Sequence, residues 1–155
     1  MGKNTFFIQI VLLFFCCRAC ASSGWIEFSP DGGVNAALKV GEKMILYKIY
    51  GVDLKRHGEI VVDSERRINI NVDDFNFDGK NDFSVWYIDD GMGVYTVHRI
   101  FMYSKKRQAF VEYFPACGDE FIDLRVDRKR RRLISTYFED NVSKSCVTRL
   151  PKNVQ

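Results

Sequence analysis

The chain has 155 residues, of which 46% are hydrophobic and 28% charged, and its formal net charge is +3 at neutral pH. Lys3 and Arg18 lie in the N-terminal segment, so the rest of the chain is close to neutral. This size suits one domain with a modest core, and this charge excludes a general electrostatic field for nucleic acid.

The N-terminal segment has the parts of a secretory signal peptide. Lys3 precedes an apolar run at residues 6–15, and Ala19-Cys20-Ala21 supplies the small residues of a cleavage site. The run is too short to span a bilayer comfortably, and Arg18 argues against an acylated cysteine anchor. We expect a signal peptide at 1–21, cleavage after Ala21, a periplasmic protein and no stable membrane insertion after cleavage.

The mature part, residues 22–155, is expected to form one domain of many short strands. Apolar and polar residues alternate with a period of two at 68–72 and 123–127. Gly-, Asp- and Pro-containing turns separate the segments, and no long helical period occurs. We predict an all-β fold, a single antiparallel β-sandwich or barrel. The other expected strands are 36–40, 44–50, 59–63, 83–88, 94–103, 109–114, 133–138 and 145–150.

The segment 74–82, DFNFDGKND, has the spacing of a calcium-binding loop. Asp74, Asn76 and Asp78 occupy the first, third and fifth positions, where a calcium loop supplies side-chain oxygens. Gly79 follows at the sharp turn, Lys80 offers a backbone carbonyl at the seventh position, and Asp82 stands at the ninth. Position twelve is Val85, where an EF-hand would have Glu.

Oxygen donors without a neighbouring His or Cys favour Ca²⁺ over zinc or copper. The segment therefore predicts a structural calcium site. The alternative is an Asx-rich turn in which the carboxylates cap the loop's own backbone amides.

Cysteine usage predicts one disulfide. Three cysteines leave with the signal peptide, so Cys117 and Cys146 are the only two in the mature chain. In an oxidising compartment such a pair is expected to be bonded, closing a loop of about 30 residues that stabilises by roughly 3 to 4 kcal/mol. The alternative is a pair of free buried thiols.

Residues 71–114, from NVDDFNFDGKNDF to the aromatic strand ending VEYF, resemble a family of exported bacterial β-proteins. That family carries a DxNFDGxxDF loop, then a Gly-rich turn, then an aromatic strand, and it is similar to the periplasmic lysozyme inhibitors. Some of its members act as immunity proteins against secreted effectors that cleave peptidoglycan. The resemblance implies a lysozyme-like or other peptidoglycan-cleaving enzyme as partner.

In the inhibitor group a Ser-Gly-x-Tyr loop enters the lysozyme cleft, and the corresponding residues here are Met92-Gly93-Val94-Tyr95. Met92 departs from the serine. The resemblance implies that Gly91, Gly93 and Tyr95 contact the partner, with His98 on the same surface if it faces outward. As alternatives, Tyr95 packs against a neighbouring strand and His98 is a satisfied or solvated strand histidine.

Other residues give little support for an enzyme. His57 and His98 are the only histidines, and neither has the spacing of a catalytic group. Asp119 and Glu120 are adjacent, so on a strand they would point to opposite faces. The basic run 128–132 is typical of a solvated hairpin tip.

We therefore expect a periplasmic calcium-binding inhibitor or immunity protein that occludes its target and catalyses no reaction. The alternative is a calcium-stabilised envelope binding or adhesion module with no enzyme target.

Overall fold

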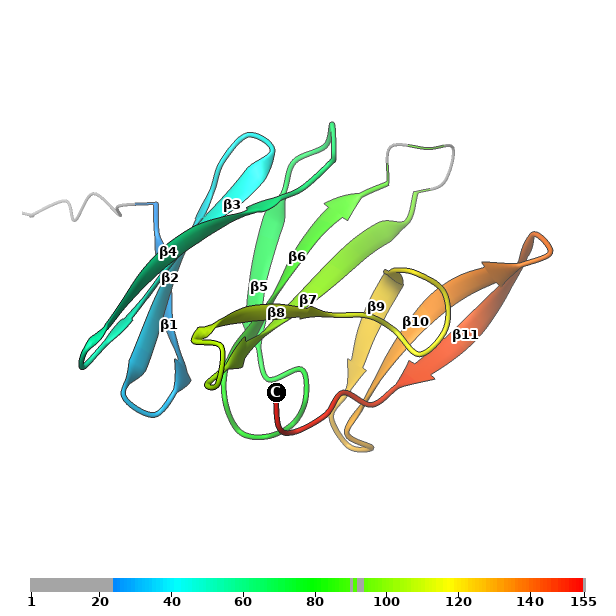
Figure 1. The fold of residues 1–155 in the computed structure, drawn as a ribbon. Helices are drawn as coiled ribbons and strands as arrows, with labels where there is room; N and C mark the ends of the chain where they lie inside the picture. Colours follow the sequence, from blue (N-terminus) through cyan, green and yellow to red (C-terminus); the bar gives the residue numbers. More distant parts are fainter. Residues whose placement is uncertain (1–23, 90, 92–93, 155) are drawn as a thin grey trace, which may run out of the picture.

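The computed structural model describes residues 24–89, 91 and 94–154 (Figure 1). The expected signal peptide, its cleavage site and Gly93 lie outside the described residues. The described chain forms two antiparallel sheets of short strands, which confirms the all-β prediction and makes the fold a β-sandwich. In this part of the chain no helix is long and apolar enough to cross a bilayer.

The first sheet has four strands in the order β1-β2-β3-β4. They are β1 (Ile26–Asp31), β2 (Val34–Val40), β3 (Met44–Gly51) and β4 (Leu54–Val61). The second sheet has the order β11-β10-β9-β7-β6-β5, and β8 also pairs with β7. Its strands are β5 (Asn69–Asp73), β6 (Asp82–Ile88), β7 (Thr96–Ser104), β8 (Ala109–Tyr113), β9 (Phe121–Asp127), β10 (Arg132–Glu139) and β11 (Val142–Thr148).

Aromatic side chains fill the core between the two sheets. Phe83 of β6 stacks on Phe101 of β7 with ring centroids 5.0 Å apart, and Phe110 of β8 meets Phe83 edge-on at 4.8 Å. Leu38 and Ile45 of the first sheet are fully buried in the same cluster. Alternating apolar residues on paired strands put these side chains on one face, as the period of two predicts.

A second core lies on the far face of the seven-stranded sheet. Phe75 and Phe77 of the acidic loop cover this face, together with Leu150 and Val154 near the C-terminus. Buried partners from the sheet are Ile100, Met102, Phe121 and Leu133. Strands β6 and β7 are therefore buried on both faces over part of their length.

Two strands differ from the expectation. β1 was missed because Pro30 lies within it, and proline is tolerated there because β1 is an edge strand. β4 begins at Leu54 rather than at residue 59, and it pairs along its length with β3. Its first half was not predicted because Lys55, Arg56 and His57 show no alternation of apolar and polar residues. The other predicted strands occur with boundaries shifted by a few residues.

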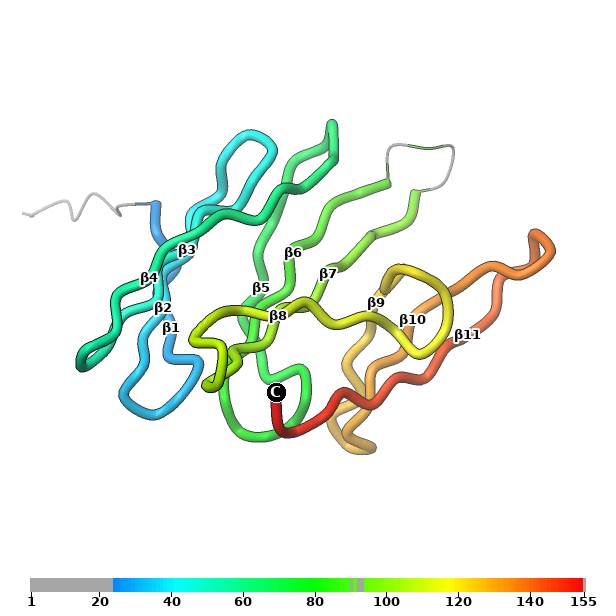
Figure 2. The backbone as a smooth tube through the Cα atoms, viewed as in Figure 1, coloured from blue at the N-terminus to red at the C-terminus, as the bar shows by residue number. Residues whose placement is uncertain are grey.

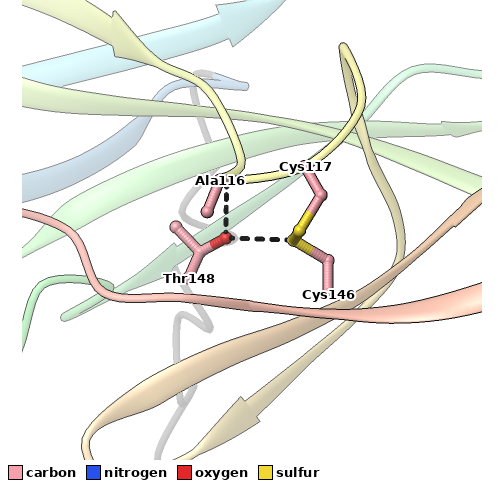
Figure 3. The surroundings of a disulfide bond; sticks show 4 residues. All are labelled: Ala116, Cys117, Cys146 and Thr148. Carbon is pink, nitrogen blue, oxygen red and sulfur yellow. Dashed lines mark hydrogen bonds between the residues drawn. A yellow bond between two sulfur atoms is a disulfide. The ribbon is translucent and has the colours of Figure 1, made fainter.

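Strand β7 forks along one edge. Val97 and His98 pair with β9, whereas the second half of the strand pairs with β8. The predicted disulfide, Cys117–Cys146, ties the loop between β8 and β9 to β11, with Cα atoms 5.8 Å apart (Figure 3). Beside it, the Ala116 N–H donates to Thr148 Oγ1 at 2.9 Å. The cysteine prediction is confirmed.

Candidate functional site

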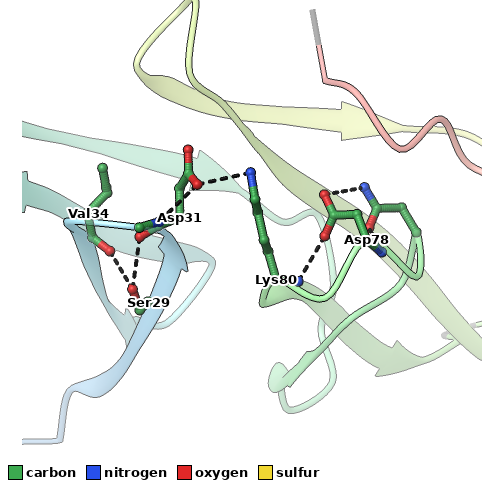
Figure 4. Close-up of polar contacts among 7 residues, drawn as sticks. Ser29, Asp31, Val34, Asp78 and Lys80 are labelled. Carbon is green, nitrogen blue, oxygen red and sulfur yellow. Dashed lines mark hydrogen bonds and ion pairs between the residues drawn. The ribbon is translucent and has the colours of Figure 1, made fainter.

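In the acidic loop between β5 and β6, carboxylates accept hydrogen bonds from the backbone amides of the same loop. The Asp74 carboxylate accepts from the N–H of Asp78 at 3.1 Å and of Gly79 at 2.8 Å. Asp78 Oδ1 in turn accepts from the Lys80 N–H at 2.9 Å (Figure 4). Gly79 has φ 88°, a left-handed conformation that glycine adopts without strain. The first, fifth and sixth loop positions therefore form a closed turn.

Asn76, at the third loop position, is buried and bonded in both directions. Its Oδ1 accepts from the Asp78 N–H at 3.2 Å, and its Nδ2 donates to the Pro151 carbonyl at 3.1 Å. A carboxylate here would place a negative charge against that carbonyl oxygen, whereas an amide both donates and accepts. Asn76 thus ties the loop to the C-terminal segment.

Asp82 is the most perturbed acid of the loop. Its side chain accepts from the Phe75 N–H at 3.1 Å, and the residue is only 4% exposed. Burial, together with the charges of the neighbouring Asp78 and Asp74 carboxylates, raises the pKa of Asp82 to about 8. A buried carboxyl group with two carboxylates nearby is stable only when it is protonated or when a cation neutralises its charge.

The cations around the loop pair with other acids. Lys80 Nζ lies 2.9 Å from Asp31 Oδ1, and Arg128 Nη2 lies 2.5 Å from Asp73 Oδ2. The basic run expected to be a solvated tip therefore has one end bound beside the acidic loop. Neither ion pair neutralises the carboxylates at the first, fifth and ninth loop positions.

The donor set of the loop fits Ca²⁺. Asp74, Asn76, Asp78 and Asp82 offer only oxygen, and Lys80 adds a carbonyl, which is the hard donor set that calcium prefers. In the described residues no three His, Cys, Asp or Glu side chains converge as a preformed centre. The loop carboxylates instead accept from backbone amides, the arrangement of the Asx-rich alternative.

The loop between β6 and β7 has a pinned base, which means that hydrogen bonds hold its two ends in place. The Asp89 N–H donates to the Tyr95 carbonyl at 2.8 Å, and Asp123 Oδ1 accepts from both the N–H and the hydroxyl of Thr96 at 3.0 and 3.2 Å. Gly91 lies exposed above this base. Asp123, which sequence reasoning missed, is far from Thr96 along the chain, and no local signal marks it.

The Tyr95 ring packs against a neighbouring strand. It meets Phe138 of β10 edge-on with ring centroids 5.4 Å apart, the cross-strand role considered as an alternative. Tyr95 is only partly buried, and Val94 beside it is 89% exposed. We call Val94, Tyr95 and Phe138 the apical patch.

His98 lies in β7 at the fork, away from the Phe138 contact. Its ring stacks on Trp86 with centroids 6.0 Å apart, and its Nδ1 is buried without a hydrogen-bond partner. Burial lowers the pKa of His98 to about 4, against the opposing charge of Asp123. His98 is thus an uncharged packing residue on one wall of a hollow of about 550 Å³, whose other polar residues include Arg99, Glu112, Asp119 and Glu120.

The wall of this hollow is held by a bidentate ion pair. Arg99 Nε and Nη2 donate to the two Glu112 oxygens, each at 2.7 Å, and Arg99 Nη1 donates to the Val61 carbonyl at 2.7 Å. With every donor group of Arg99 directed at a protein oxygen, this arginine bridges the seven-stranded sheet to the end of β4.

The lowered pKa of His98 predicts a pH effect on stability. The neutral ring stabilises the fold fully above its unfolded pKa of about 6.5, and this contribution is lost as the pH falls toward 4. After discounting for partial solvent access, we expect a loss of about 2 kcal/mol. Chemical denaturation at pH 7 and pH 4.5 should show this loss reduced in His98→Phe. His57→Phe, at the exposed histidine, is the control, and an unreduced loss in His98→Phe would contradict the assignment.

Comparison of the chain with protein-family models, with curated proteins and with solved structures finds no match.

Proposed function

We propose that the protein is a periplasmic calcium-binding inhibitor or immunity protein, which occludes a peptidoglycan-degrading enzyme and performs no catalysis. One observation carries this proposal: the β6–β7 loop has a pinned base and presents Val94, 89% exposed, directly beside Tyr95. An exposed apolar residue next to a tyrosine, on a loop whose base is held by hydrogen bonds, is a feature of protein-binding surfaces.

The apical patch suits insertion into a cleft. Phe138 supports one side of the Tyr95 ring, so little side-chain freedom is left to lose on binding. Tyrosine presents a large rigid body and a polar tip, which can exclude water from a concave site and still satisfy a buried acceptor. An enzyme cleft that binds a glycan chain is concave and carries such acceptors.

Calcium would have a structural part in this function. Asp74, Asn76, Asp78, Asp82 and the Lys80 carbonyl would hold the ion. It would supply positive charge to carboxylates that form no ion pair within 4 Å among the described residues. The acidic loop leads directly into β6, and the far end of β6 leads into the loop between β6 and β7, which we call the apical loop. Fixing the acidic loop would therefore help to fix the strand that carries the binding surface.

Replacing Tyr95 by alanine is expected to weaken inhibition about tenfold or more while the protein stays folded, because a tyrosine anchor contributes about 2 kcal/mol or more. The measurement is titration of wild type and variant into peptidoglycan-lysis assays with several lysozyme types. Tyr50→Ala is the matched control, because Tyr50 is an exposed tyrosine on another hairpin.

Equal inhibition by wild type and Tyr95→Ala would contradict the assignment of the apical patch. No inhibition of any lysozyme or secreted muramidase by the wild-type protein would contradict the inhibitor proposal as a whole. The envelope-binding alternative would then take its place.

A further inference from the structure

Two turns that are far apart in the sequence form one basic end of the molecule. The β3–β4 hairpin carries Lys48, Lys55 and Arg56, and the β7–β8 turn carries Lys105, Lys106 and Arg107. Arg56 Nη2 donates to Gln108 Oε1 at 3.4 Å, which joins the two turns. We call these six cationic residues the basic end; both turns are drawn at the lower left in Figure 2.

The cations of the basic end lack close ion pairs in the described part of the chain. Lys105 adds to Lys80 in lowering the pKa of the Asp31 carboxyl, and Lys48 lies over the Trp25 ring, 4.2 Å from its centroid. In the described residues, none of the six has a carboxylate within 4 Å of its charged nitrogens, whereas Lys80, Arg99 and Arg128 each have one. Asp53 is the one acid in the β3–β4 turn, and it makes no ion pair there. A chain that is nearly neutral as a whole thus has an excess of positive charge at one end.

An apolar residue stands at the tip of this end. Val52 occupies the turn that joins Gly51 to Leu54, and it is 90% exposed. Turns favour Gly, Asn, Asp, Ser and Pro, and a β-branched valine has no conformational reason to be there. Tyr50, also exposed, lies two residues away on the same hairpin. Val52 is thus largely free of contacts within the fold, and its apolar side chain is available to a partner.

The hairpin also encloses space. A hollow of about 550 Å³ is lined by residues of this hairpin alone, including Lys48, Tyr50, Lys55, Arg56 and His57. Such a hollow has room for a small anionic group that carries an apolar body.

We propose that the basic end docks peripherally on a bilayer that contains anionic phospholipid. The lysines and arginines contact lipid phosphates, each contributing favourably near a negative surface, and Val52 enters the interface with Tyr50 at headgroup level. The exposed apolar tip favours a bilayer over a phosphate polymer such as nucleic acid, because only a bilayer offers an apolar layer beneath its charges.

Docking in this orientation leaves the other side of the protein free. Figure 2 shows the β3–β4 turn at the lower left, whereas the ends of β6 and β7 that border the apical loop and the β10–β11 hairpin lie toward the upper right. Bilayer docking and enzyme binding would therefore use separate surfaces. The bilayer proposal does not depend on the inhibitor proposal.

The test is sedimentation of the processed protein with vesicles of phosphatidylglycerol and phosphatidylcholine, with EGTA present so that calcium cannot bridge protein and lipid. We expect binding to the mixed vesicles, weakening with salt, and none to phosphatidylcholine alone. Lys55→Glu with Lys106→Glu is expected to lower the affinity about tenfold or more. Val52→Ser is expected to lower it about fivefold.

The control is Lys129→Glu with Arg149→Glu, which changes the net charge equally at exposed residues elsewhere and should leave the affinity within about twofold. Absence of binding to anionic vesicles overturns the proposal. So does an equal loss in the two double variants, because the effect would then follow net charge alone. Binding to single-stranded DNA but not to vesicles, with the same dependence on Lys55 and Lys106, also overturns it. Thermal melts of every variant exclude misfolding as the cause.

Discussion

Replacing Phe75 by alanine is expected to lower the free energy of unfolding by about 3 to 5 kcal/mol, the usual cost of removing a fully buried aromatic ring. Phe75 is 1% exposed and belongs to the second core, although it stands between two of the proposed calcium ligands. Its ring anchors the acidic loop to the far face of the seven-stranded sheet. Denaturant unfolding, read at the midpoint with an unchanged slope, measures the effect.

The matched control for this prediction is Phe114→Ala. Phe114 is 63% exposed, so the same truncation there should cost less than about 1 kcal/mol. If Phe75→Ala cost no more than Phe114→Ala, the acidic loop would be a surface appendage. The idea that its order is transmitted to β6 would then lose its basis.

The fold was largely predictable because its strands are amphipathic. Period-two alternation identified β5 and β9, turn signals separated most of the other expected strands, and the cysteine count identified the disulfide. The first half of β4 escaped prediction because Lys55, Arg56 and His57 do not alternate with apolar residues. The strand is held by pairing with β3 along its length, and pairing leaves no local pattern in the sequence.

The acidic loop was predictable only where its structure depends on residues close together in the sequence. The spacing of Asp74, Asn76 and Asp78 is local, and the structure contains the turn that it predicts. The bond from Asn76 to Pro151 joins residues 75 positions apart, and no pattern within the loop marks it. The burial of Asp82 likewise depends on how the loop and the sheet meet.

The basic end shows why summed charge is a weak guide to function. Composition excludes a general electrostatic field, yet the fold brings the β3–β4 hairpin and the β7–β8 turn together through the Arg56–Gln108 hydrogen bond, and both segments carry cations. Net charge is a property of the sequence, whereas potential depends on where the fold places each charge. Val52 is exposed at the same end of the molecule. A single exposed apolar residue is common, however, and does not by itself predict a binding surface.

Calcium at a thousand times its dissociation constant is expected to raise the free energy of unfolding by about 4 kcal/mol, because the ion binds the folded loop only. Asp82→Asn is expected to abolish most of this gain, since it removes a charged oxygen donor. In chelator the same variant is expected to be more stable than wild type at pH 8, on the order of 1 to 2 kcal/mol, because it removes a buried charge that lacks a cation. The measurement is denaturant unfolding of both proteins in calcium and in EGTA.

We expect Asp82→Asn to be less stable than wild type in calcium and more stable than wild type in EGTA. This change of sign distinguishes a calcium site from an Asx-rich turn. A carboxylate that only caps the Phe75 amide would make Asp82→Asn respond equally in calcium and in EGTA. Asp119→Asn controls for net charge, because Asp119 is exposed and should leave the calcium response intact. Magnesium should stabilise the wild type much less, since it demands a tighter octahedral geometry. A wild-type protein without any calcium-dependent shift would assign the loop to its own backbone amides, and the structural metal would have to be abandoned.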